Sequence, residues 1–137
     1  MVTIDRMDLE DVGDNPLRVA ASVFAQVGFS SGYVPVREIA RASVIREIKV
    51  APLTSFEGAL VTTPEKSDGI ILVKEGASMQ RTRFTIAHEL GHFLIGYHRP
   101  VGGRFECTSK DMKVSQFKPS DRAAKMEVEA NRFAAEL

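Results

Sequence analysis

The spacing of apolar residues changes along this chain, and each change predicts a different kind of element. Between Asn15 and Gly28 apolar residues recur at helical intervals, Asn15 can cap the segment, and Pro16 suits a first helical turn. The segment from Pro35 to Ala42 shows the same periodicity over a shorter length. Both segments are therefore predicted to be helices. The apolar stripe of the first consists of Leu17, Ala20, Ala21, Phe24 and Val27.

From residue 44 onwards the pattern is typical of strands. The runs 44–50, 58–63 and 69–73 are rich in β-branched and other apolar residues, and turn residues separate them. These runs predict a small, mostly antiparallel β-sheet of about three strands.

Helical periodicity then returns. A long helix is predicted from Ser78 or Met79 to Tyr97, and a final helix begins after a cap at Ser120. The polar segment 98–119 between them is predicted to be a loop, and a loop of this length in a compact domain is usually functional or disordered.

The order of these elements predicts an α+β fold, with helices packed on one face of the sheet. We expect residues 1–137 to form a single domain, because neither a linker nor a repeat divides the chain. The apolar stripe of the final helix continues to Leu137 without a stop signal, so we also expect the domain to be a fragment of a longer chain.

Composition narrows the class of protein. The chain has 18 basic and 18 acidic residues, whereas a nucleic-acid-binding domain usually has a basic excess, so we expect no direct nucleic-acid binding. A single cysteine excludes an internal disulfide and fits a reducing compartment. The first residues do not resemble a signal peptide, and no apolar run approaches the ~20 residues that cross a membrane. We expect a cytoplasmic protein without a membrane partner.

The segment His88-Glu89-Leu90-Gly91-His92 carries the clearest chemistry. Two histidines four residues apart project from one face of a helix and can present two nitrogens to one zinc ion. Glu89 lies about 100° further around the helix, where it can reach a water beside the metal and act as general base. The pattern predicts that His88 and His92 bind a metal and that Glu89 is catalytic.

A catalytic zinc site normally has three protein ligands, so one more is needed. His98 lies six residues after His92, but the long motif with that spacing needs a glycine at position 95, which is Ile95. The final helix offers Glu127 and Glu129 on opposite flanks of its apolar stripe. Because Asn131 lies on the flank of Glu127, where it can hydrogen-bond a ligand histidine, we predict Glu127 as the ligand and Asn131 as its supporting partner.

These residues also resemble a known family. The segments 81–92 and 127–137 resemble the ImmA/IrrE family of metallopeptidases, and Asn15-Pro16 and the segment 35–40 are similar to it as well. The resemblance implies a zincin-like, gluzincin-type architecture with zinc held by His88, His92 and Glu127. It also implies a bacterial or phage protein that cleaves a helix-turn-helix transcriptional repressor and thereby controls mobile-element transfer or a stress response.

We therefore expect a zinc-dependent metalloendopeptidase that hydrolyses a peptide bond through a metal-activated water. Zn²⁺ is the expected ion, with Mn²⁺ or another divalent metal as the alternative in the cell. A helix-turn-helix repressor is the expected substrate and partner. The alternative is a catalytically silent, metal-containing interaction or sensor module of a transcriptional regulatory system; the presence of Glu89 favours the enzyme, because a structural metal site needs no general base.

Three further residues have competing interpretations. Tyr97 and His98 follow the metal-binding helix and are candidate oxyanion stabilisers, although helix-end packing is the simpler interpretation. Cys107 lies in the predicted loop, where an inhibitory thiolate on the metal is one interpretation and a free cysteine without a role is the favoured one.

Overall fold

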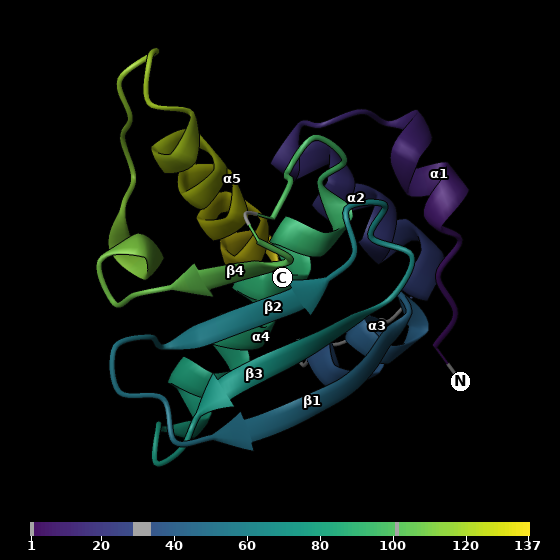
Figure 1. The fold of residues 1–137 in the computed structure, drawn as a ribbon. Coiled ribbons are helices and arrows are strands. Elements are labelled where there is room, and N and C mark those ends of the chain that lie inside the picture. The colour runs from purple at the N-terminus through teal and green to yellow at the C-terminus, as the bar shows by residue number, and fades with distance from the viewer. Residues whose placement is uncertain (1, 29–33, 101) are drawn as a thin grey trace.

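A computed structural model describes residues 2–28, 34–100 and 102–137, which form four strands and five α-helices (Figure 1). The strands build one mixed sheet in the order β1-β3-β2-β4. Strand β1 (Ile45–Ala51) pairs parallel to β3 (Gly69–Lys74), while β2 (Gly58–Thr62) pairs antiparallel with both β3 and β4 (Arg104–Cys107). The short strand β4 therefore forms one edge of the sheet.

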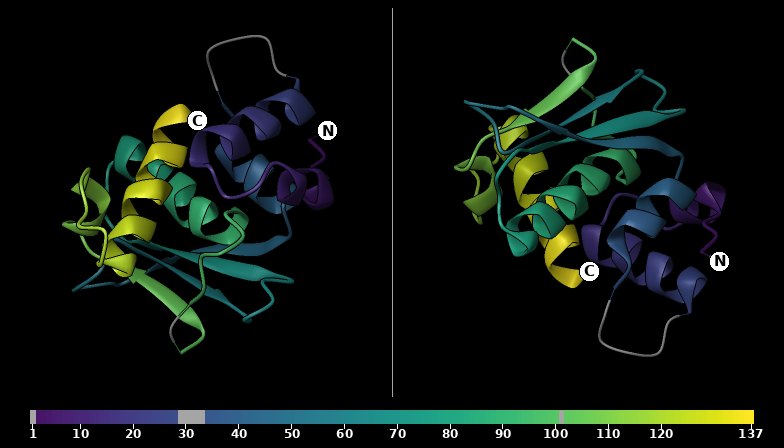
Figure 2. Two further views of the ribbon diagram at one scale, coloured as in Figure 1. Left: turned by 90° about the horizontal axis from the view of Figure 1, so that it is seen from above. Right: turned by 90° about the horizontal axis from the view of Figure 1, so that it is seen from below.

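The helices lie together on one face of this sheet (Figure 2). Helix α4 (Met79–Leu94) contacts β2 and β3 directly, and α5 (Arg122–Glu136) packs against α4. Helix α2 (Pro16–Val27) packs on α5, while α3 (Val36–Ala42) packs on α4 and β1. The short helix α1 (Arg6–Asp11) contacts α2. This arrangement buries α4 between the sheet and the other helices.

Two glycines allow the close contacts of α4. A methyl group at Gly58 of β2 would lie 2.3 Å from Thr85 Cγ2 and 3.1 Å from Glu89 Oε2, so a larger residue there would push the helix away from the sheet. A methyl group at Gly91 would lie 3.1 Å from the ring of Phe133 on α5 and 3.3 Å from the backbone of Ala130. These glycines fix the depth at which the segment 88–92 is buried.

The structure confirms the α+β class and a small sheet with two antiparallel pairings. The three predicted strands and the predicted helices occur within a few residues of the expected bounds. Ser78 caps α4 as expected, whereas the cap of α5 is Asp121 and not Ser120, because the Asp121 carboxylate accepts from the Ala124 N–H. The prediction of an unbroken loop over 98–119 is wrong, because this segment contains β4 and the 3-10 helix η1 (Asp111–Lys113).

The buried face of α2 also differs from the predicted stripe. Val19, Ala20 and Val23 are buried, whereas Leu17 is half exposed and Ala21 is exposed. The helix has apolar residues around much of its circumference, so periodicity alone does not select the face that α5 covers.

Candidate metal centre

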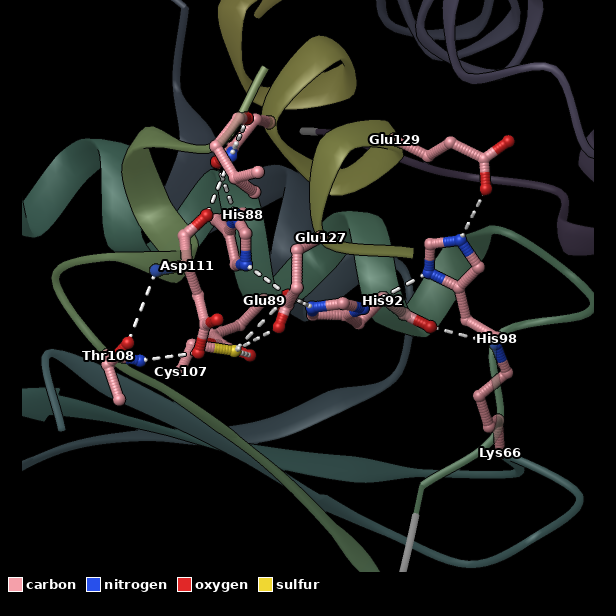
Figure 3. A network of polar contacts seen from close by, with 12 residues as sticks. Lys66, His88, Glu89, His92, His98, Cys107, Thr108, Asp111, Glu127 and Glu129 are labelled. Atoms are coloured by element: carbon pink, nitrogen blue, oxygen red, sulfur yellow. Dashed lines mark hydrogen bonds and ion pairs between the residues drawn. The ribbon is translucent and has the colours of Figure 1, made fainter. Parts of the chain in front are cut away.

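Helix α4 brings two imidazoles and α5 brings one carboxylate to the same point (Figure 3). His88 and His92 are four residues apart, so both project from one face of α4, and both are fully buried. Their Nε2 atoms lie 3.1 Å and 2.6 Å from the same oxygen, Oε1 of Glu127. Three side chains thus converge on one small space between the two helices.

Asn131 determines which nitrogen of His88 carries a proton. Its side-chain amide donates hydrogen bonds to the carbonyls of Asp111 and Val114, at 2.8 Å and 3.0 Å. Its carbonyl oxygen must therefore be the atom that lies 2.8 Å from His88 Nδ1, and it accepts the Nδ1 proton. The Nε2 lone pair of the neutral imidazole then faces Glu127.

A second chain of polar groups does the same for His92. His98 Nε2 lies 3.2 Å from the Glu129 carboxylate, which can only accept, so Nε2 of His98 is the donor. Nδ1 of His98 is then an acceptor for the Nδ1 proton of His92, 3.1 Å away. The Tyr97 hydroxyl also donates to Glu129.

The ionisation of these outer groups agrees with that assignment. Burial lowers the pKa of His98 to about 2, so its imidazole is neutral at physiological pH. Burial and then the Glu129 carboxylate raise the pKa of Tyr97, so its hydroxyl keeps the proton that it donates. The Nε2 lone pair of His92 therefore also faces Glu127.

Two imidazole lone pairs and a carboxylate oxygen that face one another need a positive charge between them. Burial lowers the pKa of His92 to about 4. Burial opposes protonation of His88 as well, but its hydrogen bond to Glu127 and the nearby carboxylates outweigh it and raise the pKa of His88. Below this raised pKa a proton on His88 supplies the charge. The same donor atoms fit a divalent metal such as zinc.

Cys107 belongs to the same group of donors. The ligand atoms of His88, His92, Cys107 and Glu127 all lie within 4.8 Å of one another. Cys107 is fully buried on β4, and its sulfur lies 3.8 Å from Glu127 Oε1 and 3.5 Å from Glu89 Oε1. Burial, and then the Glu89 and Glu127 carboxylates, raise the pKa of the Cys107 thiol well above its ordinary value.

Glu89 lies beside this group and is fully buried. Its Oε1 accepts the long hydrogen bond from the Cys107 thiol, while its Oε2 is buried without a hydrogen-bond partner among the described residues. Burial raises the pKa of Glu89 to about 8, although the charge of His88 acts in the opposite direction. A carboxylate with a pKa near neutrality is suited to accept and return a proton.

The structure brings together His88, Glu89, His92, Glu127 and Asn131, in the relative positions that sequence reasoning expected; their roles stay predictions. Tyr97 and His98 lie in the outer chain behind His92, where each contacts Glu129. Their placement supports a structural role in orienting His92 and offers no separate argument for oxyanion stabilisation.

Sequence reasoning undervalued two parts of this site. The sequence pattern predicts a loop around Cys107, whereas in the structure Phe105 and Cys107 alternate with exposed residues on one face of a strand. Phe105 stacks on the His92 ring at 4.2 Å between centroids. No sequence pattern points to Lys66, which is buried and whose Nζ donates to the carbonyls of His92 and Ile95 at the end of α4.

Among models of protein families, Peptidase_M78, described as the IrrE N-terminal-like domain, matches residues 46–137, which is more than half of the chain. A search of curated proteins finds no match. Among the described residues, no helix is long and apolar enough to cross a membrane.

Proposed function

Because the chain belongs to the Peptidase_M78 family, that of the IrrE N-terminal-like domain, we propose that it is a zinc-dependent endopeptidase whose centre is the group around Glu127. The observation that carries the proposal is the convergence of two oriented imidazole nitrogens on the Glu127 carboxylate, with a buried carboxylate, Glu89, beside them.

His88, His92 and Glu127 hold the ion in this proposal. When bound, the metal acts as a Lewis acid that polarises the scissile carbonyl and lowers the pKa of a water. Glu89 then acts as general base: it accepts the proton of the attacking water and returns it to the leaving amine. Asn131 and His98 hold the two imidazoles in the tautomer that leaves Nε2 free.

A helix-turn-helix transcriptional repressor in the cytoplasm is the proposed substrate. Strand β4 lies at the edge of the sheet next to the site, and an edge strand can bind an extended peptide through main-chain hydrogen bonds. A folded repressor must therefore present an exposed or locally unfolded segment. Selectivity among proteins is expected to come from this requirement, since Glu89 and the proposed ligands do not read the sequence of a peptide.

Incubation with a helix-turn-helix repressor, chosen from the genes that neighbour the one for this chain, tests the proposal. Cleavage should require added zinc, stop with a chelator, and disappear in Glu89→Gln, which should still bind one metal ion. Arg132→Ala, on the exposed face of α5, is the matched control and should cleave normally. Cleavage that survives in Glu89→Gln would contradict the proposal, and metal binding without cleavage of any substrate would favour the silent interaction module.

A further inference from the structure

The side chain of Cys107 reaches the candidate metal centre from a third element, the edge strand β4. The alternation along β4 buries Phe105 and Cys107 on the side of α4, while Arg104 and Glu106 are exposed. Pairing of Cys107 with Gly58 of β2 fixes its position along the sheet. The sulfur is thus placed by the sheet, and the other three donors are placed by the two helices.

The spacing of the four donors suits tetrahedral coordination. Zinc bound by nitrogen, oxygen and sulfur at ordinary distances separates neighbouring donors by roughly 3.3–3.6 Å. Here Glu127 Oε1 lies 3.8 Å from the Cys107 sulfur and 3.1 Å from His88 Nε2. The separation of 2.6 Å to His92 Nε2 is shorter, and an ion between these two atoms would widen it.

The surroundings of Cys107 offer the sulfur no better partner. It is the sole cysteine of the chain, so it cannot form an internal disulfide. Its neighbours are two carboxylates, and the nearer one, Glu89, has an oxygen that is buried without a hydrogen-bond partner among the described residues. Two carboxylates close together in a buried space repel one another, and a cation between them and the sulfur would relieve that repulsion. A thiol that coordinates such a cation loses its proton outright.

We propose that Cys107 is a fourth ligand of the metal and that its thiolate holds the site closed. This inference rests on the proposed peptidase function. A site with four protein ligands has no open position, whereas a catalytic site keeps one for water or substrate. Coordination breaks the S–H bond, forms a metal–sulfur bond and releases the proton to solvent; departure of Cys107 takes a proton up again and leaves the position beside Glu89 open.

Cobalt(II) binding tests the ligand directly, without reference to activity. The chain loaded with cobalt should show a sulfur-to-cobalt charge-transfer band in the near ultraviolet, together with the visible bands of a tetrahedral ion. Cys107→Ala should lose the charge-transfer band and still bind one ion through the two histidines and Glu127. Glu106→Gln, on the exposed side of the same strand, is the matched control and should keep the band.

Activity tests the closed state. Cys107→Ala and Cys107→Ser should cleave the repressor at least tenfold faster than the unchanged chain, each with zinc bound. Circular dichroism identifies a variant that has failed to fold, and the second substitution then decides. An unchanged or lower rate in folded variants would overturn the inhibitory role.

The outcomes separate this proposal from the peptidase function. Bound cobalt without a charge-transfer band would overturn the role of Cys107, and cleavage by the same chain would leave the peptidase intact. A charge-transfer band with no cleavage by either cysteine variant would identify Cys107 as a ligand in a site that is not a peptidase, and would refute the closed-enzyme interpretation. Failure of the chain to bind any divalent metal would overturn both proposals.

Discussion

At the scale of single residues, the orientation of the two histidines depends on side chains that are not themselves among the proposed metal ligands. Asn131 donates to two backbone carbonyls, and this fixes its own oxygen toward His88. The Glu129 carboxylate accepts a hydrogen bond from His98 Nε2, so His98 Nδ1 carries no proton and accepts the one on His92 Nδ1. Each ligand imidazole is therefore oriented from behind, by a partner on the neighbouring helix or on the loop after α4.

Replacement of Asn131 should weaken metal binding without removing a ligand. Asn131→Ala should lower zinc affinity by about 10–100-fold, because His88 loses the acceptor that fixes its tautomer and ring orientation. Glu129→Gln should have a smaller effect, since it acts on His92 only through His98. Competition with a chromophoric chelator measures both, and Arg132→Ala should bind as the unchanged chain does. An affinity unaltered by Asn131→Ala would contradict the assigned tautomer of His88.

The protonation of His88 should make metal binding dependent on pH. The pKa of His88 is raised above 6.5, so below that raised value a metal ion must displace its proton. Affinity should therefore fall roughly tenfold per pH unit as the pH decreases through this region. His92, with a pKa lowered to about 4, should not add to the slope near neutral pH.

Cys107→Ala is the suitable background for this measurement, because metal binding to this variant cannot release a proton from the thiol. Zinc affinity measured across the range from about pH 8 to about pH 5 gives the slope directly. A flat profile would show that His88 is not among the ligands or is not protonated in the metal-free chain.

At the scale of elements, the segments with a sustained pattern were predictable, whereas the short elements α1, β4 and η1 were not. The sixteen residues of α4 carry a cap at Ser78 and a sustained apolar face, so local sequence determines the helix. Strand β4 has four residues, of which only Phe105 and Cys107 face inward, and two alternations do not distinguish a strand from a loop. The parallel pairing of β1 with β3 depends on where the chain crosses the sheet, which residue patterns do not encode.

The end of α4 depends on Lys66, which lies far from it in sequence. Lys66 Nζ donates to the carbonyls of His92 and Ile95, at 2.8 Å and 2.7 Å. Lys66→Met should lower the free energy of unfolding by about 1–3 kcal/mol, because the His92 carbonyl loses this donor and the Ile95 carbonyl keeps only its bond from the His98 N–H. Denaturant unfolding in the presence of a chelator measures this loss without a contribution from metal.

Lys49→Met is the matched control, since Lys49 is exposed on β1. It should change the free energy of unfolding by less than about 0.5 kcal/mol. Equal effects of the two substitutions would show that the contacts of Lys66 with α4 contribute nothing to stability.

At the scale of the whole molecule, the candidate metal centre joins three elements from different parts of the chain. His88 and His92 come from α4, Cys107 from β4, and Glu127 from α5. The positions of His88, Glu89 and His92, and the choice of Glu127, could be predicted from the sequence, because each depends on the periodicity of a single helix. The contribution of Cys107 was not, because it depends on the position of an edge strand relative to a helix, and only the folded sheet determines that.

Removal of metal should therefore destabilise the fold as a whole. An ion that binds the folded chain and not the unfolded one stabilises it by about 2.7 kcal/mol at a free concentration 100 times its dissociation constant, and by about 4.1 kcal/mol at 1,000 times. The thermal midpoint should rise with zinc and fall with a chelator. Hydrogen exchange should show the largest loss of protection in α5, which the metal links to α4.

In Glu127→Ala zinc should raise the thermal midpoint much less, because the ligand on α5 is gone. If zinc stabilises this variant as strongly as the unchanged chain, the ion binds elsewhere, and α5 holds no part of the metal centre.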